Sequence, residues 1–386
     1  MIITMEDMMF FKNFYMIRLS LIMLISLFAA GCFLDDEENL ELVFADNVVV
    51  IENDITVPTT WDSTKVYYIE YRMGVTASLT IPAGTVIKFG REGGIDIDAT
   101  GTINAVGTAG QPIIFTSVKD DRFGGDSILD GVTSGSRGDW GQLWFSYVNG
   151  STLNYCQFHF GGNAGTVSES VINLFGGSNV SITNCLFAFN TGSGSDMTGA
   201  LEANGSGSGT VITGNRFYGN ILPLSINGNM SLDDSNNFSS VETDPNTGEP
   251  LFINTYNGVF IEVSDGIGTV AWRETEVALV PATNNTILVN DNETLTIGNN
   301  VVMKFLDSAH FEFDSSNGAS INYSAGAVDF TSYKDDSRLG DTNGNGAASA
   351  PDAVNGNWDG VWRWNSGTAE WERLFVTDCQ YLIPLP

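Results

Sequence analysis

Basic residues are scarce in this chain. Its 386 residues include 16 Lys and Arg against 46 Asp and Glu, which gives a formal net charge of -30 at pH 7. Because so negative a field repels phosphate backbones, the charge balance excludes nucleic acid as a partner and disfavours polyanionic glycans unless cations intervene. The same excess of carboxylates suits solubility, salt tolerance and the binding of divalent cations.

Histidine and cysteine are also rare. The two histidines, His159 and His310, occupy unrelated positions, so neither a zinc-binding pair nor a nucleophile relay can be built from them. Four cysteines are present, and three of them, Cys156, Cys185 and Cys379, lie in the body of the chain. An odd number argues against a disulfide framework, so we expect buried free thiols.

No window long enough for a helix shows a 3.6-residue apolar period. Instead, apolar residues alternate in short runs between residues 79 and 115, which is the periodicity of strands with one buried face. Turn residues separate these runs, in the segments PAG, GREGG, ATG and GTAGQP. The pattern leaves a sandwich, a barrel and a parallel β-helix open. The residues that we expect to point inward are Ile81, Ile87, Ile97, Ile113 and Phe115.

The sequence of residues 79–121 recurs at residues 295–336. Lys88 is answered by Lys304, and both copies end on Lys-Asp-Asp. Between the copies, phenylalanine recurs after Asn, Cys or Gly motifs at positions 158, 187, 217 and 238. A motif that returns at the length of one coil suits a stack of coils.

The segments LTIPAGTVIKF, IIFTSVKDD, DWG and LNYCQF, in that order, resemble the right-handed parallel β-helix (pectin-lyase-like) repeats of many bacterial surface lipoproteins. The resemblance covers most of the chain after about residue 50, with Trp358 answering Trp140 and Cys379 answering Cys156. It implies an all-β fold, a right-handed parallel β-helix in two duplicated units. It implies no activity, because members of the family range from polysaccharide lyases to passive surface stalks.

The chain opens with a targeting segment, residues 1–31. Lys12 and Arg18 precede an apolar run over residues 19–30, which is too short to span a bilayer comfortably. The run ends in AAGC, which resembles a lipoprotein signal cleaved before Cys32. We therefore predict that Cys32 is lipidated and anchors the protein in the cell envelope of a bacterium, at the outer membrane or cell surface. The alternative is a plain secretory signal with an incidental cysteine.

Composition divides the remainder of the chain. Residues 32–47 are acidic and lack an apolar period, so we predict a solvated tether. We expect a first β-helix unit at residues 48–240, a linker rich in turn residues at 241–251 and a second unit at 252–386. Only QYLIPLP follows Cys379, so we expect the second unit to be short or truncated.

One loop carries a candidate metal site. Residues 341–352, DTNGNGAASAPD, follow a calcium-loop pattern with oxygens at positions one, three and five, glycine at six and a carboxylate at twelve. The predicted ligands are Asp341, Asn343, Asn345, the carbonyl of Ala347 and Asp352, with Ser349 acting through water. Calcium is the cofactor that we predict, against the alternative of a solvated Asn/Gly turn. In the first copy Ile128 stands where an oxygen ligand is needed, so we interpret that loop as decayed.

Carboxylates at loop bases are the candidates for catalysis, namely Asp120, Asp121, Asp139, Asp335, Asp336 and Asp359. They could form the acid pair or metal site of a polysaccharide lyase or glycoside hydrolase, with Lys119 or Lys334 as the basic partner. Their presence in both copies favours a structural role at turns, since an active site is seldom needed twice. We therefore assign no catalytic residue.

Tryptophans crowd into the segment WDGVWRWNSGTAEW, which begins at position 358. Alternation along a strand puts Trp362 and Trp364 on one face. If that face looks outward, its rings offer platforms on which sugar rings stack. We favour packing in the core, because Leu143 and Phe145 in the first copy indicate that large residues pack at this place.

These features favour a lipid-anchored surface protein that acts as a structural module or binds a glycan or another surface protein. The alternative is a polysaccharide lyase or glycoside hydrolase of the same fold. The expected partners are the membrane, through the lipid, and a polysaccharide or surface protein, with nucleic acid excluded.

Overall fold

The computed structural model describes residues 42–163, 169–238, 242–243, 248, 250–251, 253–346, 348–374 and 377–385. The predicted signal peptide, the predicted lipidation site Cys32 and most of the predicted acidic tether lie outside these residues. Phe44–Pro386 form one compact unit. Its described regular structure consists of strands and one 3-10 turn, η1 (Ser315–Asn317). In this part of the chain, no helix is long and apolar enough to cross a membrane.

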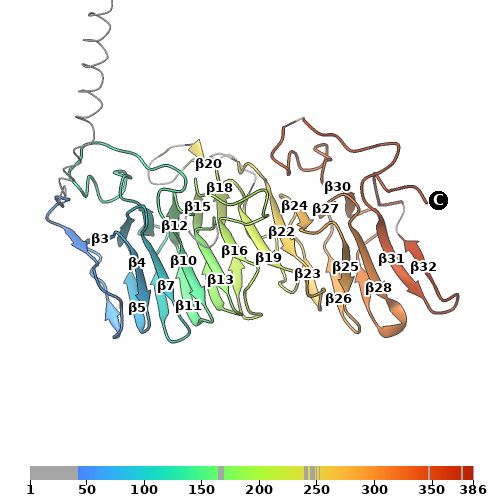
Figure 1. Ribbon diagram of the computed structural model, residues 1–386, viewed down its shortest axis with the longest axis horizontal. Helices are drawn as coiled ribbons and strands as arrows, with labels where there is room; N and C mark the ends of the chain where they lie inside the picture. Colours follow the sequence, from blue (N-terminus) through green and yellow to red (C-terminus); the bar gives the residue numbers. More distant parts are fainter. Residues whose placement is uncertain are drawn as a thin grey trace, which may run out of the picture. The chain divides into compact units, whose positions relative to one another are not determined.

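Three long sheets wind along this unit (Figure 1). The seven-stranded sheet contains β1 (Val48–Val50), β3 (Val66–Ile69), β6 (Val86–Phe89), β9 (Ile113–Ser117), β12 (Cys156–His159), β15 (Leu186–Ala188) and β18 (Arg216–Tyr218). The ten-stranded sheet contains β4 (Arg72–Val75), β7 (Gly94–Ile97), β10 (Leu143–Ser146), β13 (Ile172–Phe175), β16 (Leu201–Ala203), β19 (Leu224–Asn227), β22 (Gly258–Glu262), β24 (Ala278–Pro281), β27 (Val302–Phe305) and β30 (Asp329–Ser332). The six-stranded sheet contains β2 (Thr59–Thr60), β5 (Ser78–Pro82), β8 (Thr102–Val106), β11 (Asn149–Asn154), β14 (Asn179–Thr183) and β17 (Val211–Thr213).

Three smaller sheets complete the described structure. The four-stranded sheet contains β25 (Thr286–Val289), β28 (His310–Asp314), β31 (Gly360–Asn365) and β32 (Glu370–Leu374). The three-stranded sheet contains β23 (Val270–Trp272), β26 (Thr294–Ile297) and β29 (Ser320–Asn322). The pair β20 (Glu242–Thr243) and β21 (Pro250–Leu251) stands apart from them.

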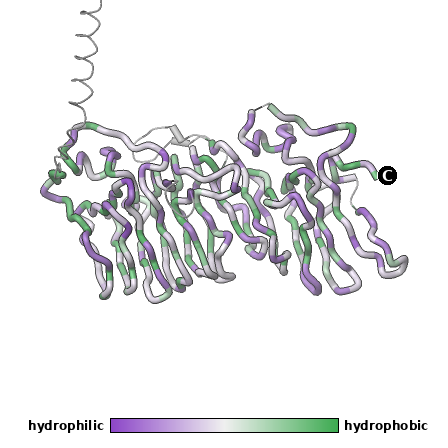
Figure 2. Tube along the Cα trace, in the orientation of Figure 1, coloured by the Kyte–Doolittle hydropathy of each residue, from purple (hydrophilic) through white to green (hydrophobic). Residues whose placement is uncertain are grey.

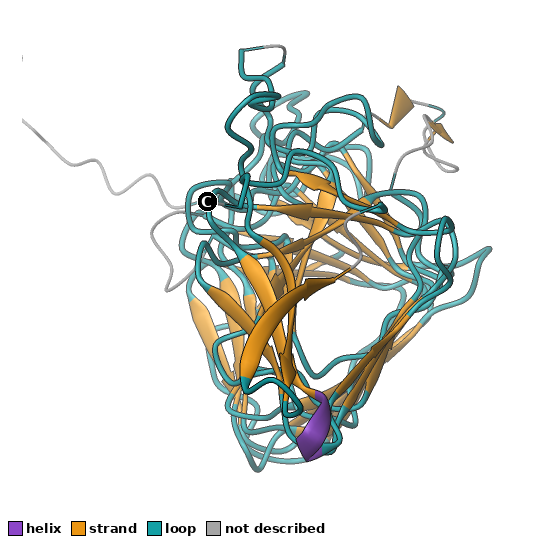
Figure 3. Ribbon diagram, turned by 90° about the vertical axis from the view of Figure 1, so that its right-hand side faces the viewer, coloured by secondary structure: helices purple, strands orange, loops and turns teal. Residues whose placement is uncertain are grey.

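Neighbouring strands in a sheet come from successive coils of the chain and run parallel. In the seven-stranded sheet, for example, β3 pairs with β6 and β6 with β9, both in parallel. Among the described strands, only β20 with β21 and β31 with β32 pair antiparallel. The end-on view in Figure 3 shows the sheets facing one another across the interior. The fold is therefore the all-β, right-handed parallel β-helix that the sequence predicts, and a sandwich is excluded.

Alternation along each strand sorts side chains between the interior and the outside. The isoleucines and the phenylalanine predicted to point inward are at most 1% exposed, and Figure 2 shows hydrophobic and hydrophilic residues alternating along the coils. These side chains belong to one hydrophobic cluster that continues from Ile55 in the first coils to Val361. One core therefore runs through both copies of the sequence repeat.

A column of phenylalanines stacks along the interior beneath the seven-stranded sheet. Phe115, Phe158, Phe187, Phe217 and Phe238 follow one another with ring centroids 4.8, 5.0, 4.8 and 5.0 Å apart. Each stacked pair contributes about 0.5–1.5 kcal/mol beyond the burial of its surface. The recurring phenylalanine motif thus places one ring in each of these successive coils, as the sequence indicated.

Asparagines form a second column at a turn between strands. The Asn190 side chain donates from Nδ2 to Asn220 Oδ1 at 3.1 Å, and Asn220 repeats this contact with Asn254 Oδ1 at 2.9 Å. Each Oδ1 also accepts a backbone N–H from the previous coil, as Asn220 Oδ1 does from Asn190 at 3.0 Å. All three side chains are buried. Buried amides are costly when unpaired, so this ladder ties the register of neighbouring coils.

The strands of the second copy of the repeat lie in a different sheet from their counterparts in the first copy. The strands β24, β27 and β30 match β3, β6 and β9 in sequence, yet they continue the ten-stranded sheet and not the seven-stranded one. The strand β22 makes the join, because it pairs with β19 on one side and with β24 on the other. The ten-stranded sheet therefore contains strands from both sides of the predicted linker at residues 241–251.

A fully buried carboxylic acid, Glu274, lies between β23 and β24 near this join. Its Oε1 accepts a 2.9 Å hydrogen bond from the Glu276 N–H, and its Oε2 has no hydrogen-bond partner. Burial, aided by the nearby carboxylates of Asp234 and Glu276, raises the pKa of Glu274 from 4.5 to about 8. The side chain is therefore protonated in the folded protein at neutral pH.

We predict that Glu274→Gln removes a pH dependence of stability. The folded protein keeps the Glu274 proton up to about pH 8, whereas the unfolded chain releases it near pH 4.5. Wild-type stability should therefore fall relative to the variant as pH rises through this window, by up to roughly 1.4 kcal/mol per pH unit. Urea unfolding at several pH values in the window measures the difference. Unfolding free energies that run parallel for the two proteins would contradict the prediction.

Candidate functional site

A long loop follows β9 and covers part of the outer face of the seven-stranded sheet. Lys88, in β6, lies beneath this loop and is fully buried. Its Nζ donates to the carbonyl of Gly125 and lies 3.9 Å from Asp121 Oδ1. Burial lowers the pKa of Lys88, and the nearby aspartates, led by Asp121, oppose that shift. The lysine therefore serves as an internal counter-ion that fastens an acidic loop to the sheet.

The loop that follows β30 is fastened in the same way. Lys304, in β27, is fully buried, and its Nζ donates to the Gly340 carbonyl at 2.7 Å and to Thr342 Oγ1 at 2.8 Å. Burial lowers the pKa of Lys304 to about 8, although Asp336 and its neighbours favour the charged form. Lys88 and Lys304 are sequence counterparts. Their shared role in both loops is structural.

The candidate catalytic carboxylates are also engaged in holding loop bases. Asp120 and Asp335 are buried, and each accepts a 2.6 Å hydrogen bond, from Thr116 and Thr331 respectively. Burial opposes ionisation of Asp120, but the hydrogen bonds from Arg122 and Thr116 hold its pKa below the ordinary value. These two aspartates are inaccessible to a substrate.

The remaining candidates are dispersed. Asp139 accepts hydrogen bonds of 2.9 Å from Ser117 Oγ and from the Ser136 N–H. Asp359 pairs with Arg373. Among the described residues, no group of three or more His, Cys, Asp or Glu side chains is placed to hold a metal ion. Asp139 and Asp359 are therefore engaged by neighbouring groups of the fold.

The predicted calcium loop folds around its first aspartate. Asp341 accepts the N–H of Gly346 at 2.6 Å and the N–H of Asn345 at 3.3 Å. Gly346 has a φ of 64°, which a residue with a side chain seldom adopts. The first-copy loop has the same turn, since Asp126 accepts the N–H of Gly131 at 2.9 Å. The turn therefore forms in both loops, including the one that lacks a complete set of oxygens.

The other predicted calcium ligands are occupied locally. Asp352 accepts the N–H of Asn355 at 2.9 Å, and this bond, with the Asn355 amide and the Val354 N–H, holds the pKa of Asp352 below its ordinary value. Asn343 donates from Nδ2 to the Tyr333 carbonyl at 3.1 Å. Ala347 lies outside the described residues. In the described part of the loop, no hydrogen bond joins Asp352 to the turn at Asp341.

The two histidines lie in strands of different sheets. His159, in β12, is fully buried, and its Nε2 lies 3.1 Å from Gln157 Oε1. His310, in β28, faces outward with its Nε2 3.0 Å from Thr286 Oγ1 and 3.1 Å from Glu312 Oε1. Neither is placed as a zinc ligand or a nucleophile relay.

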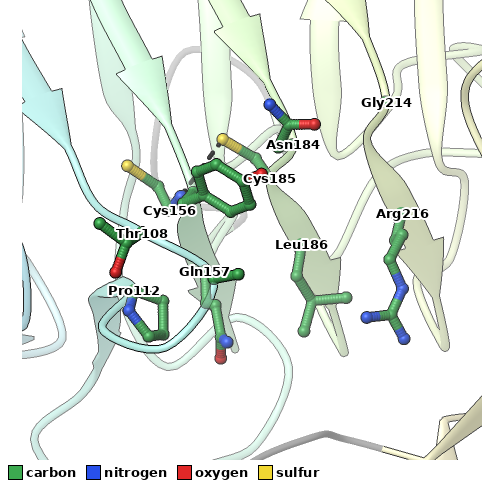
Figure 4. A pocket seen from close by; sticks show the side chains of 11 residues that line it. Thr108, Pro112, Cys156, Gln157, Asn184, Cys185, Leu186, Gly214 and Arg216 are labelled. Carbon is green, nitrogen blue, oxygen red and sulfur yellow. Dashed lines mark hydrogen bonds between the residues drawn. The ribbon is translucent and has the colours of Figure 1, made fainter.

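A pocket of about 300 Å³ opens where the six-stranded sheet turns into the seven-stranded sheet (Figure 4). Cys156 and Cys185 line it as free, buried thiols, as predicted, while Cys379 is half-buried. The Cys156 and Cys185 thiols donate to the carbonyls of Ala105 and Leu153 at 3.5 and 3.4 Å. Burial and the adjoining Cys185 thiol raise the pKa of Cys156 well above its usual range. The Cys156 thiol is therefore structural and not nucleophilic.

The strand β31 presents tryptophans to the outside of the four-stranded sheet. Val361 is fully buried in the core, and alternation places Trp362 and Trp364 on the opposite, outward side, where both are partly exposed. Trp371, in the antiparallel strand β32, lies directly opposite Trp364 with ring centroids 5.6 Å apart. The favoured expectation of core packing for Trp362 and Trp364 is therefore wrong. Together Trp362, Trp364 and Trp371 form what we call the tryptophan face.

Polar groups border the tryptophan face. The Arg373 guanidinium lies 5.1 Å from the centre of the Trp362 ring and donates to the Ile383 carbonyl at 2.7 Å. On the other side, Glu312 in β28 pairs in register with Trp362. The Arg373 side chain is 5% exposed and also pairs with Asp359, so it braces the Trp362 ring. The rings can stack on the C–H face of a sugar while Glu312 contacts its hydroxyls.

Sequence reasoning missed Arg373, Glu312 and the place of Trp371. The turn residues Asn365, Ser366 and Gly367 were the available signal, because a hairpin there sets Trp371 opposite Trp364. Glu312 could not be located, since its approach to Trp362 depends on the pairing of strands from different coils.

Residues 53–163 match the family described as pectate-lyase like beta helix domain. Neither the curated proteins nor the solved structures contain a match to this chain. The matched segment covers the first coils and the loop that follows β9, and it ends before the tryptophan face. The comparisons thus support a pectate-lyase-like parallel β-helix and name no activity for it.

Proposed function

We propose that this protein is a lipid-anchored protein of the bacterial cell surface or outer membrane, and that its β-helix binds glycans through the tryptophan face. The observation that carries the glycan-binding proposal is the outward position of Trp362, Trp364 and Trp371 beside Arg373 and Glu312. The lipid anchor is supported by the AAGC sequence that ends at Cys32.

Ring chemistry favours a sugar as the ligand. A tryptophan ring offers a large apolar surface with a polar edge, and such surfaces on the outside of a protein mark binding sites. Trp371 is 41% exposed, so its ring is reachable. Because the net charge is -30, the face suits a neutral glycan better than a polyanionic one. A second surface protein is the alternative occupant of the same face.

A polysaccharide lyase or glycoside hydrolase is the alternative function, and it draws its support from the family match over residues 53–163. The buried positions of Asp120 and Asp335 weigh against it. Incubation of the protein with uronate polymers and neutral glycans separates the two functions. A binding module leaves the polymers unchanged, whereas an enzyme produces unsaturated uronates or new reducing ends.

We predict that Trp362→Ala together with Trp364→Ala weakens binding of the mature protein to soluble neutral glycans. Each lost stacking contact should lower affinity roughly 2- to 12-fold. Isothermal titration against glucan, xylan and mannan measures the loss. The matched control is Tyr71→Ala, which removes another exposed ring, 67% exposed, from the first coils. Equal affinities for the wild type, the double variant and the control would refute the tryptophan face as a glycan site.

Calcium at residues 341–352 remains a proposal, supported by the oxygens of Asp341, Asn343 and Asn345 around Gly346. Calcium binds the folded loop alone, so at 100-fold excess over its dissociation constant it should stabilise the protein by about 2.7 kcal/mol. Melting curves with calcium or chelator check this. Asp341→Ala should abolish the shift, while Asp126→Ala in the first-copy loop should keep it. If calcium shifts all three proteins equally, or none, residues 341–352 form only a turn.

The lipid anchor predicts that Cys32 carries fatty acid. In the native host, labelled fatty acid should enter the wild-type protein and the control Cys379→Ala, and it should fail to enter Cys32→Ala. The readout is label on the purified protein after removal of free lipid. Equal label in the wild type and in Cys32→Ala would refute lipidation at Cys32, and no label in either protein would indicate a plain secretory signal.

A further inference from the structure

A second group of aromatic rings lies outside the ten-stranded sheet, far from the tryptophan face in sequence. In β10, Leu143 and Phe145 are fully buried, so alternation turns Trp144 outward. Phe175, at the end of β13, has its ring centroid 6.2 Å from that of Trp144. Tyr147 adds a third ring, 5.7 Å from Phe175 and nearly perpendicular to it. Trp144, Tyr147 and Phe175 are here called the first-coil platform.

The platform is exposed and held in place by its backbone. Phe175 is 47% exposed and Tyr147 58% exposed. The N–H of Tyr147 donates to the Phe175 carbonyl at 3.1 Å, which joins the two coils at this point. A Cβ at Gly176 would come 2.6 Å from the Tyr147 ring, so the glycine lets the ring lie across the turn. The rings are therefore presented to solvent by an ordered part of the solenoid.

Hydrogen-bonding side chains flank the rings in register. Asp96 pairs with Trp144 on one side, and Asn173 pairs with it on the other. Asp96 also forms an ion pair with Arg72, and Asn173 donates from Nδ2 to Glu202 Oε2 at 2.7 Å. Carboxylate and amide groups beside an aromatic ring suit the hydroxyls of a sugar whose C–H face lies on the ring.

The first-coil platform repeats the arrangement of the tryptophan face. Trp144 and Trp362 each follow an inward aliphatic residue, Leu143 and Val361, at matching places of the two copies. Each also has a carboxylate in register on the preceding coil, Asp96 beside Trp144 and Glu312 beside Trp362. Seven strand spacings separate the two places along the solenoid, which is roughly 34 Å. One mode of binding could therefore operate at two separate positions.

We propose that the first-coil platform is a second glycan-binding site, and that its ligand is a neutral polysaccharide. The proposal rests on the proposed function, because it takes the same ligand class for both sites. Neutral sugars are favoured, since the nearest carboxylates, Asp96 and Glu202, add to a net charge of -30 that repels uronate and sulfate groups. Binding of a neutral ligand should also be nearly insensitive to salt.

The test uses Tyr147→Ala with Phe175→Ala in the mature protein, and separately Trp144→Phe, which keeps a ring. Isothermal titration with soluble glucan, xylan and mannan should show a loss of roughly 2- to 12-fold for each ring removed, and little loss for Trp144→Phe. Tyr71→Ala is the matched control, and melting curves confirm that the variants remain folded. The double variant of Tyr147 and Phe175 should fold normally, because both rings are exposed.

The possible results separate the two proposals. If Trp362→Ala with Trp364→Ala weakens binding while Tyr147→Ala with Phe175→Ala does not, the first-coil platform is refuted and the proposed function stands. If only the second pair weakens binding, the platform is supported and the tryptophan face loses its assignment. If wild-type protein binds no neutral glycan, or binds uronate polymers alone with strong salt dependence, the platform as proposed is refuted.

Discussion

The stacking of each coil on the coil before it is the constraint on which the rest of this structure depends. A parallel ladder sets successive strands roughly 4.8 Å apart, so each side chain lies beside the one at the same position of the next coil. Phenylalanines at such positions stack, and buried asparagines such as Asn220 pass hydrogen bonds from coil to coil. A buried amide without a partner costs about 1–3 kcal/mol. A coil that slipped out of register with its neighbours would therefore leave these asparagines unpaired.

This constraint moves any binding chemistry to the outside. Inward positions are taken by one continuous apolar core, which leaves outward strand faces and loops for ligands. The long loops are restricted in turn, because buried Lys88 and Lys304 fasten them to the sheets and Asp120 and Asp335 hold their bases. The chain has 16 basic residues against 46 acidic ones. Two of the basic residues, Lys88 and Lys304, are buried beside aspartates of the loops. The exposed rings on outward strand faces are among the groups that the fold leaves reachable from solvent.

The fold could be predicted from the sequence because its causes are local. Alternation placed Ile81 and Phe115 inward, and the recurring phenylalanines indicated one ring per coil. The placement of the second copy's strands in a different sheet from their counterparts could not be predicted in this way. Strands on all three faces of the solenoid point alternate residues inward, so nothing in the pattern of β22 shows that it joins β19 in the ten-stranded sheet. That choice depends on the path of the chain between them.

The two copies differ at one inward position beside the outward tryptophans. The inward position that Phe145 fills in the first copy is held by Arg363 in the second. Beside β31 lies the antiparallel strand β32, whose Glu372 pairs with Arg363, so this position can carry a charge. Alternation puts Trp362 and Trp364 on the outer side of β31, as it does Trp144 in the first copy, and there exposed apolar surface costs roughly 25 cal/mol per Å². Three rings kept on that side at such a cost favour a ligand that covers them.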